Sequence, residues 1–173
     1  EKSFRIETPK GLKGATTVAL AKIHEKNLEI VNLGDSSVIV FRHSEIGFTK
    51  VLQTKQQDHR FNAPYNLSTF FGEGGHYSDE PKDADEYKMA IQSGDVVILV
   101  TDGITDNLFT ENIREILSTL DSSLESFPEK ACQTIIDEAD TFSRSHRSTP
   151  WSMKCGRYGG KPDDMTIVLC QVL

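Results

Sequence analysis

The stretch SGDVVILVTDGITDNL, residues 93–108, places five consecutive apolar residues directly before an acidic turn. A short, continuous apolar run of this kind is typical of a strand that is buried on both faces. Gly103 permits a tight turn at the end of the run, so the carboxylate of Asp102 should project at the edge of a sheet and not into the core. The fold must therefore contain a buried strand that ends in acidic side chains.

Shorter β-rich runs occupy the first third of the chain. Each pair of runs is separated by a turn of hairpin length, HEKN or EIG, so we expect four strands in a meander. The expected strands are residues 16–23, 28–33, 37–42 and 48–54. Residues 56–88 carry several prolines, glycines and aspartates, and we expect a long functional loop there with little regular structure.

Two helices and a last strand follow the buried run. Thr110 is a plausible N-cap for a first helix, with apolar residues at positions 113, 116, 117 and 120. Residues 125–143 carry one apolar stripe and should form a second helix that packs on a sheet. Residues 148–161 read as a polar connector, and the final MTIVLCQVL reads as a central strand because it is continuously apolar. This order predicts one α+β layered domain over residues 1–173.

Charge and composition exclude several function classes. The net charge is −7, and the 19 Lys and Arg residues are scattered, so no clustered basic surface for nucleic acid is expected. The three cysteines lie far apart without a C-x-x-C motif, which favours reduced thiols over a disulfide framework. No apolar run approaches the roughly 20 residues that a membrane-spanning helix needs, so we expect no transmembrane segment.

Acidic residues flank three of the β-rich runs. Asp35 follows LEIVNLG, Asp102 and Asp106 follow VVILV, and Asp163 in GGKPDD precedes the last strand. Each of these alone is compatible with a turn or a cap. Carboxylates crowded at one end of a sheet repel one another unless a cation holds them, and oxygen ligands favour Mg²⁺ or Mn²⁺ over zinc. The three acidic segments together therefore predict a site for a hard metal ion.

The same three segments resemble the motifs of the metal-dependent protein phosphatases of type 2C. The segments NLGDSS, TDGITDNL and DDMTIVLC match that family's motifs in the same order. The sequences of three segments resemble those of the mitochondrial branch of the family, which also has chloroplast relatives. These segments are GATTVALAKI, QQDHRFNAPYNLS and GGKPDDMTIVL. The resemblance extends over residues 14–173.

This resemblance implies a fold, a reaction and a set of metal ligands. The expected fold is an α+β sandwich of two antiparallel sheets flanked by helices. Asp102 and Asp163 would hold two catalytic Mg²⁺ or Mn²⁺ ions, and Asp35 and Asp106 would join Asp102 at a weaker third ion, with Asp164 as a neighbour. An activated water would then hydrolyse phosphoserine or phosphothreonine in protein substrates, without a catalytic nucleophile from the chain.

Two further expectations concern the residues that contact the substrate and the cellular location of the protein. His59 and Arg60 in the long loop are candidates for substrate binding, and a solvated loop is the alternative. The similarity to the mitochondrial branch implies a location in the mitochondrial matrix, with chloroplast or cytoplasm as alternatives.

The resemblance covers roughly the C-terminal two-thirds of such a phosphatase domain. The family's upstream acid-Gly motif, and the two helices that cover one sheet, have no match here, so we expect an incomplete domain that alone is inactive or a weak enzyme. The alternative function is a catalytically incomplete relative that uses the loop at residues 56–88 to bind a partner protein. A calcium-binding module is disfavoured, because the dense alternating acids of an EF-hand loop are missing.

Overall fold

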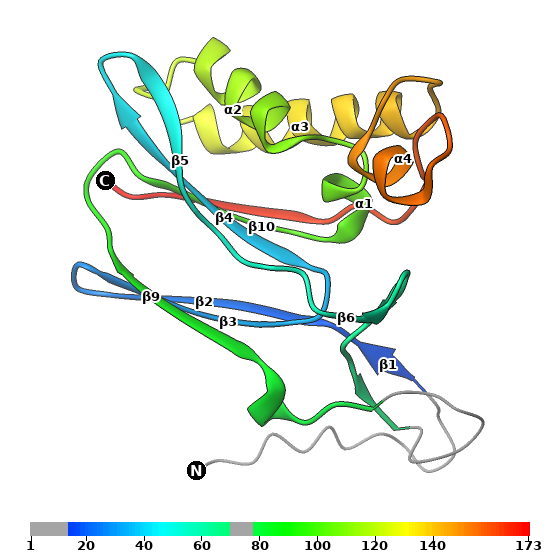
Figure 1. The fold of residues 1–173 in the computed structure, drawn as a ribbon. Helices are drawn as coiled ribbons and strands as arrows, with labels where there is room; N and C mark the ends of the chain where they lie inside the picture. The colour runs from blue at the N-terminus through cyan, green and yellow to red at the C-terminus, as the bar shows by residue number, and fades with distance from the viewer. Residues whose placement is uncertain (1–13, 70–77) are drawn as a thin grey trace.

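Two antiparallel β-sheets pack face to face, and helices cover the outer face of one of them (Figure 1). This architecture is seen in a computed structural model, which describes residues 14–69 and 78–173. The four-stranded sheet has the order β11-β10-β4-β5, and the three-stranded sheet has the order β2-β3-β9. The predicted α+β sandwich of antiparallel sheets is confirmed.

The strands of the two main sheets have the following bounds. The four-stranded sheet consists of β4 (Ser37–Ser44), β5 (Gly47–Gln53), β10 (Val96–Val100) and β11 (Ile167–Gln171). The three-stranded sheet consists of β2 (Val18–His24), β3 (Asn27–Leu33) and β9 (Asp85–Ala90). Two short pairs and one 3-10 turn complete the β-rich part: β1 (Ala15–Thr16) with β8 (Leu67–Ser68), β6 (Asp58–Arg60) with β7 (Ala63–Pro64), and η1 (Pro81–Asp83).

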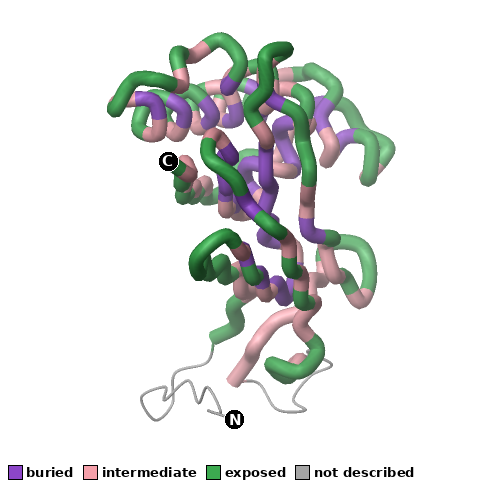
Figure 2. The backbone as a smooth tube through the Cα atoms, turned by 90° about the vertical axis from the view of Figure 1, so that its left-hand side faces the viewer, coloured by how far each residue is buried: buried purple, intermediate pink, exposed green. Residues whose placement is uncertain are grey.

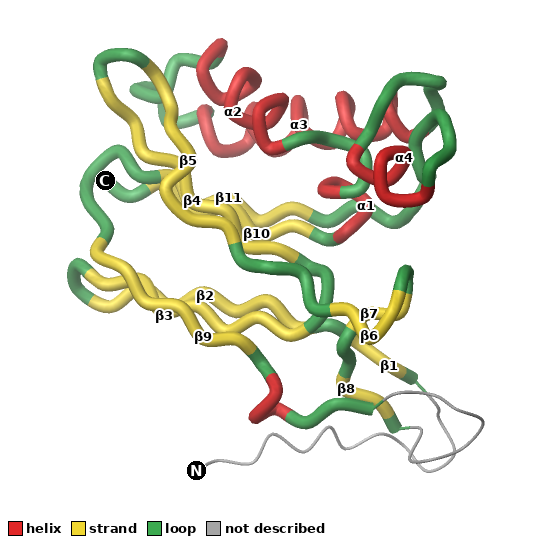
Figure 3. The backbone as a smooth tube through the Cα atoms, in the orientation of Figure 1, coloured by secondary structure: helices red, strands yellow, loops and turns green. Residues whose placement is uncertain are grey.

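The helices lie on the side of the four-stranded sheet that faces away from the three-stranded sheet (Figure 3). They are α1 (Asp102–Thr105), α2 (Thr110–Thr119), α3 (Phe127–Ser143) and α4 (Pro150–Cys155). Every residue of the stripe predicted for the second helix is buried: Phe127, Ala131, Ile135, Ala139 and Phe142. None of these helices is long and apolar enough to cross a bilayer, a statement that holds for the described residues.

Burial on both faces explains the continuous apolar runs. On β4, Val38 and Val40 face the three-stranded sheet, whereas Ile39 and Phe41 face the helices, and all four are fully buried. The buried positions accordingly gather along the middle layer and on the inner sides of the helices (Figure 2). A strand in the middle of a three-layer structure cannot alternate apolar and polar residues, and this is why VVILV was recognisable from the sequence.

The predicted four-strand meander is wrong in its connectivity. The pairs β2-β3 and β4-β5 form as expected, but they belong to different sheets. Gly34 lies between them with φ of +95°, and a Cβ at this position would overlap the carbonyl oxygen of Tyr65. A glycine turn therefore carries the chain from one sheet to the other.

The segment at residues 56–88 has more regular structure than predicted. It contains three short strands, one 3-10 turn and the beginning of β9, and its residues 70–77 lie outside the described part. The strand β9 reads DEYKMA, and its residues alternate between exposed and half-buried. Half of the residues of DEYKMA are charged, although alternate residues pack on the sandwich. The composition of this segment therefore did not indicate a strand.

Three other expectations change. The strand β11 lies at the edge of its sheet and not at its centre, because among the described strands it pairs only with β10. Val168 is accordingly 57% exposed. The expected connector contains α4, which Thr149 caps by accepting a hydrogen bond from the Ser152 N–H at 3.1 Å. The N-cap of α2 is Phe109 and not Thr110, and the Asn112 side chain accepts from its N–H. The three cysteines, at positions 132, 155 and 170, are free thiols in this structure.

Candidate metal centre

Strand pairing brings the three acidic segments to one edge of the four-stranded sheet. The end of β10 is paired with the start of β11 (Val100 with Ile167) and with the start of β4 (Val100 with Ser37). Asp102 follows β10, whereas Asp163 and Asp35 precede the other two strands. Antiparallel order therefore places residues that are up to 128 positions apart at the same edge.

A lysine lies at the centre of the acidic cluster. The Nζ atom of Lys161 donates to Oδ2 of Asp102 at 2.8 Å, to Oδ2 of Asp163 at 2.9 Å and to Oδ2 of Asp106 at 3.1 Å. Burial alone would lower the pKa of this ammonium group, but the hydrogen bonds that it donates to Asp102, Asp163 and Asp106 outweigh burial and raise it. The hydrogen bond from Lys161 also lowers the pKa of Asp163. Three carboxylates of the cluster thus already bind one cationic group, the ammonium of Lys161.

Asp35 completes the acidic edge without touching Lys161. It lines a small cavity together with Asp58 and Asp106. Burial, followed by the negative charges of Asp102, Asp58 and Asp106, raises the pKa of Asp35 to about 6. Burial and the neighbouring carboxylates therefore favour the protonated form of this carboxyl group.

Backbone contacts hold the two acidic loops together. The side chain of Asn107 is fully buried and donates to the carbonyl oxygens of Gly103 and Lys161, both at 2.8 Å. Its Oδ1 atom accepts from the Lys161 N–H, also at 2.8 Å. A Cβ at Gly103 would overlap the backbone of Asp164, so glycine permits the close approach of these loops. These contacts fix the loop that carries Lys161 and Asp163 against α1.

Other residues near the cluster were not assigned from the sequence. Lys154 lies 3.6 Å from Oδ1 of Asp106 and donates to Oε1 of Gln56 at 2.5 Å. The ring of Trp151 lies 4.9 Å from Nζ of Lys161. In the sequence, Lys161 was visible only as the lysine of GGKPDD, and its distance along the chain from Asp102 concealed the contact.

The predicted neighbour and the two predicted substrate contacts lie outside the cluster of four aspartates. The backbone N–H of Asp164 donates to Oδ1 of Asp163 at 2.9 Å, so Asp164 adjoins the cluster through its main chain. His59 lies 3.0 Å from a carboxylate oxygen of Asp79 and stacks on Tyr65 with 4.1 Å between ring centroids. Arg60 ends β6, next to His59. These placements leave the substrate-binding roles of His59 and Arg60 as predictions.

The cluster suits a hard cation in the kind and charge of its donors. Asp35, Asp102, Asp106 and Asp163 supply carboxylate oxygens, which are the ligands preferred by Mg²⁺ and Mn²⁺. Over residues 14–69 and 78–173, no three His, Cys, Asp or Glu side chains are already arranged as a metal-binding group. The centre of the carboxylates is instead taken by the Lys161 ammonium group, so a metal ion there would have to replace it.

Comparison with known proteins decides the family. Residues 5–173 match the family described as stage II sporulation protein E (SpoIIE). The chain belongs to the SpoIIE/PP2C-type phosphatase family. This family assignment agrees with the resemblance drawn from the three acidic motifs.

Several curated relatives are identical to this phosphatase-family chain at about a third of the aligned positions. It is 35% identical to "Protein phosphatase 2C homolog 7, mitochondrial" of Saccharomyces cerevisiae, 33% to "Probable protein phosphatase 2C 80" of Arabidopsis thaliana and 32% to "Protein phosphatase PTC7 homolog fig" of Drosophila grimshawi. Each match covers 92% of the chain, but only 50%, 38% and 54% of the respective relative. The chain thus spans about half the length of these proteins.

Solved structures support the fold assignment. The photosystem II phosphatase PBCP matches with a TM-score of 0.79 and 24% identity, over 93% of this chain and 65% of that one. The catalytic domain of the serine/threonine phosphatase PstP, in complex with two manganese ions, matches with a TM-score of 0.56 and 19% identity, over 92% of this chain and 59% of that one. Both comparisons place this family member in the phosphatase fold.

Proposed function

We propose that the protein hydrolyses phosphoserine and phosphothreonine in protein substrates, and that it uses Mg²⁺ or Mn²⁺ held at the acidic edge. The observation that carries the proposal is the convergence of Asp102, Asp106 and Asp163 on one cationic centre at 2.8–3.1 Å. Membership of a phosphatase family and relatives that are named protein phosphatases support it.

Each acidic residue has a proposed task. Asp102 and Asp163 hold two catalytic ions, while Asp35 and Asp106 hold a weaker third ion together with Asp102. A hard divalent ion, when bound, supplies Lewis acidity toward phosphoryl oxygens and toward water. The carboxylates position that charge at the sheet edge, and the side chain of Trp151 lines the adjoining cavity. The proposed nucleophile is water, so no side chain forms a covalent intermediate.

The proposal is tested by phosphate release from a phosphothreonine peptide. We expect release with Mn²⁺ or Mg²⁺, no release in excess chelator, and no release from Asp102→Asn combined with Asp163→Asn. Metal dependence is the deciding readout, so even slow turnover is informative. The matched control is Asp121→Asn combined with Asp137→Asn, which removes two exposed carboxylates elsewhere and should retain release. Release that persists in chelator would rule out this mechanism.

A second candidate is a catalytically incomplete relative that binds a partner protein. The observation in its favour is the Lys161 ammonium group, which already satisfies the carboxylates of Asp102, Asp106 and Asp163. Such a protein would show no metal-dependent release and no stabilisation by Mn²⁺. Phosphate release that requires Mn²⁺ therefore decides against it.

We also propose a mitochondrial location, in the matrix. This location is supported by the similarity to the yeast relative, whose name describes that protein as mitochondrial.

A further inference from the structure

Three cavities adjoin one another beside the acidic cluster. The middle one, here the Asp35 cavity, has a volume of about 40 Å³ and is lined by Asp35, Asp58 and Asp106 together with side chains that it shares with its neighbours. It shares Gln56 and Lys154 with a cavity of about 320 Å³, here the Thr110 cavity. The shared walls make Asp35 and Asp106, two members of the acidic cluster, part of a longer groove.

The second neighbour lies on the other side of Trp151. This Arg157 cavity has a volume of about 400 Å³ and is lined by Phe61, Trp151, Lys154, Cys155 and Arg157. It shares Phe61, Trp151 and Lys154 with the Asp35 cavity. Lys154 thus lines all three cavities, and the smallest of them, which is lined by Asp35, Asp58 and Asp106, is the middle one.

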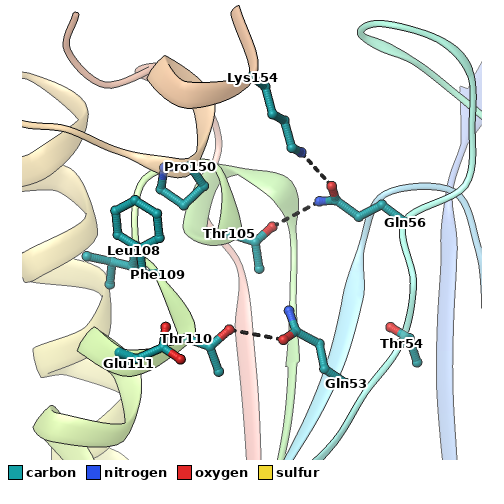
Figure 4. A pocket seen from close by; sticks show the side chains of 10 residues that line it. All are labelled: Gln53, Thr54, Gln56, Thr105, Leu108, Phe109, Thr110, Glu111, Pro150 and Lys154. Atoms are coloured by element: carbon teal, nitrogen blue, oxygen red, sulfur yellow. Dashed lines mark hydrogen bonds between the residues drawn. The ribbon is translucent and has the colours of Figure 1, made fainter.

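The Thr110 cavity offers hydrogen-bonding groups along one wall (Figure 4). The Gln56 amide group bridges Lys154 at 2.5 Å and Thr105 Oγ1 at 3.4 Å, and it separates this cavity from the Asp35 cavity. Further along, the Thr110 hydroxyl donates to Gln53 at 3.0 Å. Leu108, Phe109 and Pro150 supply the apolar part of the lining, and the exposed Glu111 lies at the far end.

The Arg157 cavity has aromatic and cationic walls. Phe61 and Trp151 lie 5.2 Å apart between ring centroids, and Phe61 is 57% exposed although it is a large apolar residue. The guanidinium group of Arg157 is exposed, and no carboxylate in the described part of the chain pairs with it. An exposed Phe61 on a half-buried Trp151, beside an unpaired cation, is the composition of a recognition surface and not of a core.

We propose that this groove binds an extended segment of the phosphorylated protein. The phosphoryl group lies at the Asp35 cavity, and the residues on either side of it occupy the Thr110 and Arg157 cavities. This inference rests on the proposed function and adds which side chains of the groove contact the residues that flank the phosphorylated one. A small phosphomonoester would use only the middle cavity, whereas most of the groove's volume lies in the two outer cavities.

The charges at the two ends give the groove a direction. Arg157 favours an acidic residue in its cavity, and Glu111 favours a basic residue at the opposite end. A peptide that carries both flanking charges can therefore lie across the acidic cluster in one orientation only.

The test compares two phosphonate analogues of phosphothreonine that the protein cannot hydrolyse: one within a peptide with charged flanks of both signs, the other as the free amino acid. Trp151 is the only tryptophan of the chain and lines the middle cavity, so its fluorescence reports the binding of both analogues in the presence of Mn²⁺. We expect the peptide analogue to bind about tenfold more tightly or better, because only the peptide contacts the outer cavities.

Charge reversal at each end of the groove locates the flanking residues. Arg157→Glu and Glu111→Arg should each weaken binding of the peptide about fivefold relative to the free amino acid analogue. The matched controls are Lys130→Glu and Glu129→Arg on α3; Glu129, like Glu111, lies in the first turn of its helix, and neither control residue lines the three cavities. Both controls should leave the ratio of the two dissociation constants unchanged.

The possible outcomes separate the groove from the proposed function. Equal affinity for the two analogues, or equal effects of the groove and control variants, would overturn the groove even if phosphate release still depends on Mn²⁺. Failure of both analogues to bind, together with no metal-dependent release, would instead overturn the proposed function and the groove with it.

Discussion

The ammonium group of Lys161 contacts three carboxylates, and its positive charge offsets part of their negative charge. The Lys161 side chain is 19% exposed, and the carboxylate of Asp106 is 5% exposed, so solvent screens this contact only weakly. A metal ion bound by the same carboxylates would compete with Lys161 for them. The lysine therefore stabilises the metal-free protein and opposes metal binding.

The variant Lys161→Gln tests this competition. Loss of the positive charge leaves three neighbouring carboxylates uncompensated, so the metal-free protein should lose about 2–4 kcal/mol of unfolding free energy. The increase in Tm caused by Mn²⁺ should become larger than in the unchanged protein, because no ammonium group has to be displaced. Lys88→Gln, which removes an exposed pair with Glu29, is the control and should cost no more than about 1 kcal/mol. An unaltered Mn²⁺ response in Lys161→Gln would contradict the competition.

Asp35 gives the metal-free protein a dependence on pH. Its folded-state pKa of about 6 lies above the ordinary value of 3.8, so the folded state binds this proton more tightly than the unfolded state does. The contribution of Asp35 to stability therefore decreases as the pH rises from about 4 to about 6, and the full penalty remains above that window. The charges that face it and act in this direction are Asp102, Asp58 and Asp106.

The variant Asp35→Asn should remove this penalty. We expect its Tm without metal to exceed that of the unchanged protein at about pH 7.5, and the difference to shrink at about pH 4.5. Asp137→Asn, an exposed change on α3, should shift the Tm by similar small amounts at both pH values. A difference for Asp35→Asn that is equal at both pH values, or larger at the lower one, would show that the carboxyl group is not destabilised by its surroundings.

At the level of the elements, the site depends on the contact between α1 and the loop before β11. The buried Asn107 side chain makes three hydrogen bonds of 2.8 Å to the backbone on both sides of this contact. Its removal leaves buried polar groups of Gly103 and Lys161 without partners. The loop that carries Asp163 then loses its attachment to the helix that carries Asp102.

The variant Asn107→Ala should therefore affect both stability and metal binding. We expect a loss of about 1–3 kcal/mol for the unsatisfied groups and a smaller increase of Tm with Mn²⁺. Asn112→Ala is the matched control, because the Asn112 side chain only accepts a hydrogen bond from the Phe109 N–H at the start of α2. Its loss should cost about 0.5–1.5 kcal/mol without a change in the Mn²⁺ response. The role of Asn107 in holding the site would be refuted if both variants responded equally to Mn²⁺.

The elements that sequence periodicity predicts well are those whose surroundings are uniform. The helix α3 has one buried stripe and the strand β10 is buried on both faces, so their patterns were clear. The strand β9 and the helix α4 were missed because β9 is half exposed and α4 has only six residues. Thr149 followed by Pro150 was an available signal for the start of α4.

The site was predictable only in part, for a related reason. Asp102, Asp163, Asp35 and Asp106 each adjoin a strand, so their convergence follows from antiparallel pairing. The contacts of Lys161 and Gln56 depend on how loops pack, and nothing in the local sequence of either residue specifies its partner across the fold.

At the scale of the whole molecule, the layered fold turns three separate motifs into one acidic edge. The middle sheet is held between the helices and the three-stranded sheet by two apolar clusters, which fix the ends of β4, β10 and β11 relative to one another. We propose that the chain acts as one domain whose layers together position a single site. The central claim is that this edge is a site for a divalent cation.

The most direct test of that claim is thermal unfolding with and without Mn²⁺. At an ion concentration about a hundredfold above the dissociation constant, binding adds about 2.7 kcal/mol, which raises the Tm of a domain of this size by about 5–10 °C. Asp102→Asn combined with Asp163→Asn should abolish this increase, whereas Asp121→Asn combined with Asp137→Asn should preserve it. Equal stabilisation of the first double variant and the unchanged protein by Mn²⁺ would contradict the assignment of the acidic edge as the metal site.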